Sequence, residues 1–306
     1  MSRTIALAFL LTFAIPLHAQ RQLGARPTDS GGPLLPEQAA YDVTFYDLAL
    51  AINPEQRSIE GSVCVEAKIV QPIEWFVLDL DTALTATKVE LLNRALQTSA
   101  LKFEKRGSRI WIHMRNSRQS GEQVSVRVFY NGKPKIAPMP PWVGGFTWAK
   151  TAEGQHWIAT SVQNDGADLW WPCKDHPSDE ADSVAITVTV PKPLVVASNG
   201  KLRRVSENPK QTRTYFWFHS NPINNYNVAL NIAPYRTLET TYKSTAGETV
   251  PVIFYALPES FDKAQALFPQ LNEHLAFYEK LLGPYPFRAD KYGVAETPHL
   301  VLQRDF

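Results

Sequence analysis

The sequence predicts an all-β protein: an antiparallel sandwich followed by a short α/β segment. Three observations support this. Apolar and polar residues alternate with a period of two over much of residues 41–256, Asn-Gly pairs at 131–132 and 199–200 end two of these runs, and helical periodicity appears only after Pro258. Alternation of this kind puts one set of side chains on each face of a sheet, and Asn-Gly favours tight turns. With 306 residues, 44% of them apolar, the chain can bury a sizeable core.

The first 19 residues have the pattern of a secretory signal. Arg3 gives a positive start, residues 5–17 an apolar core, and Leu17-His18-Ala19 a cleavage site. A polar leader with scattered Gly and Pro follows at 20–40. We therefore expect an exported protein, periplasmic or extracellular, with no membrane insertion after signal removal. The alternative for residues 1–19 is an ordinary buried helix.

The strands follow in order. Residues 41–45 alternate in one phase and residues 48–52 in the other, which predicts a β-bulge near Tyr46. Residues 59–69 keep a clean period of two and put Cys64 on the opposite face. Further strands are predicted at 75–80, 110–114, 124–130, 184–190, 194–197, 215–219, 226–232, 235–242 and 250–255.

After Pro258, apolar residues recur at three- and four-residue steps, which predicts a helix over about 261–282. Ser260 suits its N-cap, Gly283-Pro284 its end, and Pro269 a kink inside it. A short strand region follows, so these residues look like the opening of a second domain. The predicted units are 1–19, 20–40, 41–256 and 257–306.

Composition narrows the function classes. The chain has 31 Lys and Arg against 30 Asp and Glu, with no basic block, which argues against a nucleic-acid partner. Cys64 and Cys173 are the only cysteines, so this is not a disulfide scaffold, and nothing in the sequence brings the two together. They also lack the histidine spacing of a structural zinc site.

Residues 157–182 are dense in large aromatics and carboxylates, which are costly to order in a loop. One interpretation is a functional site or a domain contact. The other is a capped corner of the β-domain in which Trp170 and Trp171 fill the core. Residue chemistry alone leaves both open.

The stretch resembles the N-terminal domain of the aminopeptidase N family of zinc metallopeptidases, the gluzincins. In that family a strand carrying Gln or Glu precedes a Pro-Cys-x-Asp segment, and Gln163 and Pro172 to Asp175 match here. The resemblance implies a saddle-type β-sandwich followed by the start of a thermolysin-like catalytic domain. It also implies an exported enzyme that removes N-terminal residues from peptides. The other matching segments are 140–148, 198–200, 226–232 and 283–298.

The family's zinc signature, H-E-x-x-H, is not in this sequence. None of the seven histidines is followed by Glu and no two are four residues apart: His18, His113, His156, His176, His219, His274 and His299. The expectation is therefore no catalytic residue, no metal site and no cofactor in this chain, although zinc is the family's cofactor. We expect the chain not to be catalytic alone.

The resemblance implies a part of the substrate site. The Gln163 amide oxygen would accept a hydrogen bond from the free amine of a peptide; the alternative is a solvated strand glutamine. A second amine-binding group normally comes from a G-x-M-E-N or G-M-E-H segment, but Val301 to Arg304 stand in its place. This break suggests a frameshift, an early stop or a fragment. The candidate substrate-binding residues are Gln163, Glu296, Thr297, Pro298 and His299.

Other polar residues of this stretch have plainer interpretations. We expect Asp175 to be structural and His176 to lie at the surface. The carboxylates of Asp179, Glu180 and Asp182 could suggest calcium, but their spacing favours a solvated acidic turn.

Two functions remain open. The first is a truncated aminopeptidase relative whose partner is a missing catalytic domain. The second is an exported module that binds a protein or peptide. An exposed aromatic surface would favour the module, formed by Trp142, Phe146, Trp148, Trp170 and Trp171.

Overall fold

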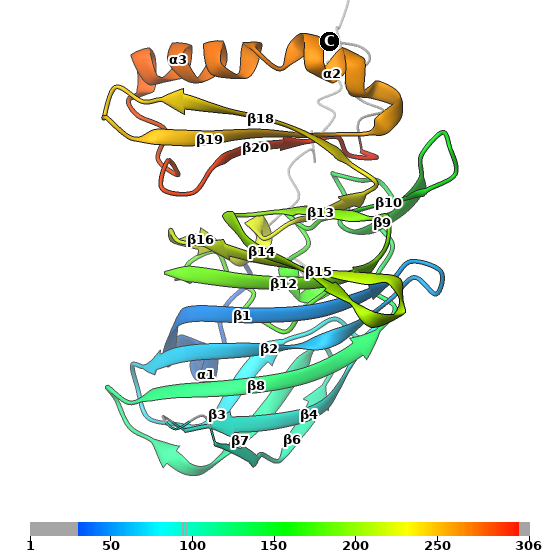
Figure 1. The fold of residues 1–306 in the computed structure, drawn as a ribbon. Coiled ribbons are helices and arrows are strands. Elements are labelled where there is room, and N and C mark those ends of the chain that lie inside the picture. The colour runs from blue at the N-terminus through cyan, green and yellow to red at the C-terminus, as the bar shows by residue number, and fades with distance from the viewer. Residues whose placement is uncertain (1–29, 94, 96, 300–306) are drawn as a thin grey trace, which may run out of the picture.

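The computed structural model of the chain describes residues 30–93, 95 and 97–299. Its largest sheet has eight strands in the order β14-β15-β12-β1-β2-β8-β4-β5 (Figure 1). The predicted signal, residues 1–19, and most of the predicted leader lie outside the described residues. No helix within the described part is long and apolar enough to cross a membrane. The strands of the large sheet are β1 (Tyr41–Asn53), β2 (Ser58–Ile69), β4 (Leu84–Leu92), β5 (Thr98–Ala100), β8 (Gln123–Gly132), β12 (Ser183–Pro191), β14 (Lys201–Asn208) and β15 (Thr212–His219).

Strand β1 lies at the centre of this sheet because its period-two pattern buries one face. Leu48 packs with Val63 of β2 and Ile186 of β12, and all three are fully buried. The predicted bulge is present, but the register shifts between Val43 and Phe45, slightly before the expected position. The sheet is not wholly antiparallel, because β1 pairs in parallel with β12.

Smaller sheets pack against the large one and enclose the core. A four-stranded sheet has the order β13-β17-β10-β9, a three-stranded sheet the order β3-β7-β6, and β11 pairs with β16. Trp170 and Trp171 are fully buried between these layers. The strands are β3 (Ile73–Asp79), β6 (Phe103–Arg106), β7 (Arg109–Arg118), β9 (Gly145–Lys150), β10 (His156–Ser161), β11 (Glu180–Ala181), β13 (Val195–Ser198), β16 (Ile223–Asn224) and β17 (Leu230–Ala233).

The predicted helix is confirmed, with the interruption at Pro269 that its ring imposes. It divides into α2 (Phe261–Leu267) and α3 (Gln270–Leu282), and Gly283 ends α3 with a φ of 87°. Both helices cover a sheet of β18 (Arg236–Lys243), β19 (Thr249–Ala256) and β20 (Tyr292–Ala295) (Figure 1). Because β19 pairs with β20, one sheet spans the predicted boundary at residue 256.

Two local expectations differ from the structure. Residues 226–232 were expected to form one strand, but Asn225–Asn227 is a 3-10 turn and only Leu230–Ala233 is extended. The second is the leader predicted at 20–40, because it contains a short helix, α1 (Pro36–Ala39), that contacts β3.

Cys64 and Cys173 are both free and buried.

Candidate functional site

Gln163 lies in an exposed turn just beyond the end of β10. The expectation that it sits on a strand is therefore wrong by two residues. Pairing of β10 with β9 ends at Ser161 opposite Gly145, and the chain then turns. The Gly166 amide donates to the Val162 carbonyl over 2.9 Å and closes the turn.

Two carboxylates fix this turn from either side. On one side Asp165 Oδ2 accepts the backbone N–H of Gly144 at 2.6 Å. On the other, Asp175 Oδ1 accepts the backbone N–H of Ala167 at 3.0 Å. Charge-assisted bonds to backbone donors are short and strong, so the backbone that carries Gln163 is held in one conformation. The Gln163 side chain remains at the surface.

Gly166 is required where the turn meets its carboxylates. Its φ is +94°, a region that side-chain-bearing residues rarely adopt. A Cβ at this position would lie 2.1 Å from Asp175 Oδ2 and 2.7 Å from Asp168 Oδ1. The close approach of backbone and carboxylates thus depends on the missing side chain.

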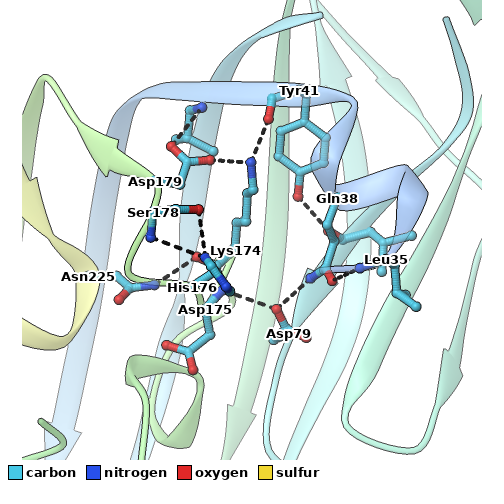
Figure 2. Close-up of polar contacts among 12 residues, drawn as sticks. Leu35, Gln38, Tyr41, Asp79, Lys174, Asp175, His176, Ser178, Asp179 and Asn225 are labelled. Atoms are coloured by element: carbon cyan, nitrogen blue, oxygen red, sulfur yellow. Dashed lines mark hydrogen bonds and ion pairs between the residues drawn. The ribbon is translucent and has the colours of Figure 1, made fainter. Parts of the chain in front are cut away.

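Asp79, at the end of β3, connects the turn to the core (Figure 2). Its Oδ2 accepts the backbone N–H of Asp175 at 3.0 Å and the Gln38 amide at 2.6 Å, and its Oδ1 accepts Arg109 Nε at 3.1 Å. Asp79 was not predicted, because a strand-end aspartate carries no local signal. Asp165 was not predicted either, although the following Gly166 marks it as a turn residue.

Lys174 and Asp179 form a buried ion pair next to this network (Figure 2). The Lys174 ammonium lies 2.5 Å from Asp179 Oδ2 and donates to the Tyr41 carbonyl at 2.6 Å. The expectation that Asp179 belongs to a solvated acidic turn is therefore wrong, because its carboxylate neutralises a buried lysine. The neighbouring His176 takes no part in this ion pair; its Nδ1 lies 2.6 Å from the Ser178 hydroxyl.

Electrostatics identifies this network as structural. Burial raises the pKa of Asp175 to about 6, although the Ala167 N–H opposes the shift, and it raises the pKa of Asp168 well above the usual value. Burial also raises the pKa of the Cys173 thiol, which keeps it from being a thiolate nucleophile. These buried carboxylates bind backbone amides and thereby position the Gln163 turn.

The second predicted segment contacts the sheet that β10 belongs to. Register places Ala197, Asn231, Ala159 and Thr147 in one row across the four strands. His299 meets the far end of this row, its Nδ1 3.4 Å from Thr147 Oγ1.

Thr297, two residues earlier, faces a cavity on this sheet. It lines a cavity of about 570 Å³ together with Ala197 and Asn231. Burial lowers the pKa of His299, and the backbone of Thr160, three residues before Gln163, opposes that shift. The structure thus brings the two predicted segments to one sheet.

Glu296 is engaged elsewhere. Its carboxylate accepts the Leu257 N–H at 3.1 Å and the Ser260 hydroxyl at 2.5 Å, at the start of the helical segment. Its carbonyl accepts the Tyr235 hydroxyl at 2.6 Å. Pro298 is half-buried between Thr297 and His299. Residues 301–304 lie outside the described part of the chain.

The aromatic residues do not form the exposed surface that a binding module would need. Phe146, Trp170 and Trp171 are fully buried, and Trp148 stacks on Phe146 with centroids 5.1 Å apart. Only Trp142 is largely exposed, at 57%. The core interpretation of Trp170 and Trp171 therefore holds, and these five aromatic residues do not form the exposed surface that would favour a binding module.

The described residues do not fit the zinc ion that the resemblance implies. Within residues 30–93, 95 and 97–299, no three His, Cys, Asp or Glu side chains come together as a metal site. The buried carboxylates near Asp79 bind backbone amides, Gln38 and Arg109 instead.

Comparison with known proteins identifies the fold. The family model for the peptidase M1 N-terminal domain matches residues 43–226. Among curated protein sequences, none matches the chain.

Solved structures of M1 enzymes share the architecture. The M1 zinc metallopeptidase of Deinococcus radiodurans is 22% identical with a TM-score of 0.67, over 84% of this chain and 56% of that one. An E323A mutant of that enzyme bound to a Tyr-Ser-Ala substrate is 23% identical, with the same TM-score and coverage. Legionella pneumophila aminopeptidase A, in complex with aspartic acid, is 18% identical with a TM-score of 0.67, over 84% of this chain and 28% of that one. This chain therefore spans only about half of the Deinococcus enzyme.

Proposed function

The chain belongs to the family of peptidase M1 N-terminal domains, and from this premise we propose that it holds the free amine of a peptide's N-terminus through Gln163. It does not hydrolyse the peptide by itself. The predicted secretory signal supports export, so the peptides would be met outside the cytoplasm. A catalytic domain supplied from outside the described residues would carry the zinc and the chemistry.

The fixed turn is the observation that carries this proposal. Gln163 is exposed, yet the backbone on both sides of it is anchored, through Asp165 to Gly144 and through Ala167 to Asp175. An exposed amide on an ordered backbone loses little conformational entropy when it binds a ligand. A solvated glutamine would need no such anchoring.

The chemistry of the Gln163 amide suits an ammonium group. Its carbonyl oxygen accepts a hydrogen bond from the N–H of a charged amine, and such charge-assisted bonds are worth about 1.5–3 kcal/mol. His299 and Thr297 lie over the same sheet and would contact the peptide beyond its first residue. The role of these residues is to bind and orient; none is assigned a proton transfer.

The test is to titrate leucine amide and N-acetyl leucine amide into residues 20–306 and to follow binding by NMR. We expect only the free amine to bind, and Gln163→Ala to weaken it about tenfold or more, since one charge-assisted bond is lost. Gln71→Ala is the matched control, because Gln71 is exposed and lies between β2 and β3. Equal binding of both amides, or an equal loss in the two variants, would contradict the proposal.

Catalysis is a separate arm of the experiment. With zinc added, we expect no release of chromophore from alanyl or leucyl anilides. Turnover that co-purifies with the chain and is lost in the Gln163→Ala variant would show that the chain is an enzyme by itself.

A further inference from the structure

The outer face of the sheet β3-β7-β6 carries an aromatic and basic surface that the amine site does not use. This sheet lies at the opposite end of the molecule from α3 (Figure 1). Trp75 of β3 pairs across the strands with His113 of β7, and their rings meet edge-on with centroids 5.1 Å apart. Trp111 packs against Trp75 at 6.1 Å, and the Arg106 guanidinium lies 4.3 Å from the Trp111 ring.

A cavity of about 680 Å³ opens on this face, which is the size of a small-molecule site. Trp75 and His113, both half-buried, contribute its aromatic side. Lys102, Glu104 and Arg115 bring its charged groups, and all three are exposed. The remaining lining residues are Ala100 and Phe103.

The charges of this cavity leave it positive. Glu104 is already paired with Arg106. Within the described part of the chain, neither Lys102 nor Arg115 has a carboxylate partner; Arg115 Nη2 donates to the Ala100 carbonyl at 2.7 Å. Two cations therefore stand beside an aromatic wall with their charge available to an anion.

Arg115 also has a strained backbone. Its φ is +44°, in the left-handed region that costs a residue with a side chain about 1 kcal/mol or more. Asn or Gly would adopt this conformation more readily. The Arg115 side chain lines the cavity, so the strained residue is part of the surface itself.

We propose that this cavity binds an acidic sugar unit, such as a uronate ring of an anionic polysaccharide. The C–H face of the ring packs on the part of Trp75 that Arg106 leaves uncovered, the guanidinium lying 5.3 Å from the Trp75 ring centroid. The carboxylate of the sugar lies between Lys102 and the Arg115 fork. A peptide lying across this face would find no free main-chain groups on β7, which is hydrogen-bonded to β3 and β6 on both sides, and strand pairing would require the outer edge of β3 or β6. A neutral sugar would leave both cations unused.

The experiment titrates tetragalacturonate into residues 20–306 at low salt and follows tryptophan fluorescence. We expect saturable binding, weakened about tenfold by Lys102→Glu. Arg115→Asn should weaken binding by a similar factor while melting at the same or a higher temperature, since it relieves the strained φ. Arg57→Asn is the matched control: its φ is +51° in a turn outside this cavity, so it should relieve strain and leave binding unchanged.

Four results would overturn the proposal. Absence of saturable binding at millimolar concentrations of tetragalacturonate would show that the cavity is not a binding site for acidic sugars. Equal binding of the methyl-esterified tetramer would refute carboxylate recognition. Tighter binding of tetraglutamate, or of a thymidine oligonucleotide, weakened by the same two variants, would assign the surface to an acidic peptide or a nucleic acid instead.

Discussion

At the scale of single residues, the order of the Gln163 turn depends on contacts that a single methyl group would break. Gly166 combines a φ of +94° with carboxylate oxygens closer to its missing Cβ than any real contact allows. Asp175 is held there by its bond to Ala167 and by its own N–H to Asp79, so it cannot retreat. The position accepts glycine alone.

Gly166→Ala should therefore destabilise the protein by at least about 2 kcal/mol, from strain and steric overlap together. Urea unfolding measures this. Gly154→Ala is the control, with a φ of +81° but nothing within 4 Å of its Cβ, so it should cost only about 1 kcal/mol. Equal costs would mean that the carboxylates move aside.

The raised pKa of Asp175 gives a pH prediction. Its pKa is about 6 in the folded protein, above the ordinary aspartate value of 3.8, so the folded state binds more protons between these pH values. Its contribution to stability is complete below pH 4 and is lost as the pH rises through 6. Asp175→Asn should thus gain roughly 1–2 kcal/mol over wild type between pH 5 and pH 8.

The measured quantity is the difference between wild type and variant. His219 and His299, whose pKa values are lowered by burial, change stability in the opposite sense over part of this range in both proteins. A difference that stays constant from pH 5 to pH 8 would contradict the assignment.

At the scale of elements, Glu296 joins β20 to the start of α2. Its carboxylate receives the Leu257 N–H and the Ser260 hydroxyl, in the way that a helix N-terminus favours an anion. This contact gives Glu296 a clear structural use, whatever the segment does for a peptide.

Glu296→Ala should cost about 1–2 kcal/mol in unfolding free energy, since two donors lose their acceptor. Leucine amide affinity should stay unchanged. Glu273→Ala, an exposed position in the first turn of α3, is the control for removing one negative charge. An affinity that falls with Glu296→Ala at constant stability would instead support direct binding to the amine.

Elements also show what sequence patterns can and cannot predict. The strands with one buried face, such as β2 and β12, follow from alternation alone, and Pro269 predicts the break between α2 and α3. The 3-10 turn at Asn225–Asn227 was not predicted, because its apolar neighbours continue a strand-like pattern. Gln163 was placed from its resemblance to a family, but Asp79 and Asp165 act through contacts distant in sequence, which no local pattern reveals.

At the scale of the whole molecule, the unit of β18, β19, β20, α2 and α3 is attached to the sandwich by polar contacts centred on Asp290 and Lys291, and α3 carries an open apolar face. Lys291 Nζ donates to the carbonyls of Ser198 and Gly200, at 2.6 and 2.5 Å, and Asp290 accepts the Ser220 N–H at 3.0 Å. The exposed apolar residues of α3 are Phe277, Tyr278, Leu281 and Leu282. We propose that this face meets the catalytic domain supplied from outside the described residues.

Hydrogen exchange should show that α3 opens more readily than the eight-stranded sheet. The α3 amides should exchange before those of β1, β2 and β8, and limited proteolysis should cut first within residues 267–290. The eight-stranded sheet should survive as a resistant product. Uniform protection along the chain would mean that the unit and the sandwich unfold together.

The parallel pairing of β1 with β12 limits the order in which the strands can pair while the chain is being synthesised. Ribosomes release β1 early, and β2 can pair with one of its edges soon afterwards. The other edge waits until residues 183–191 emerge, and it stays open while more than a hundred residues are synthesised. During that interval the nascent chain presents an unpaired apolar strand, which is the state that chaperones bind and that aggregation exploits.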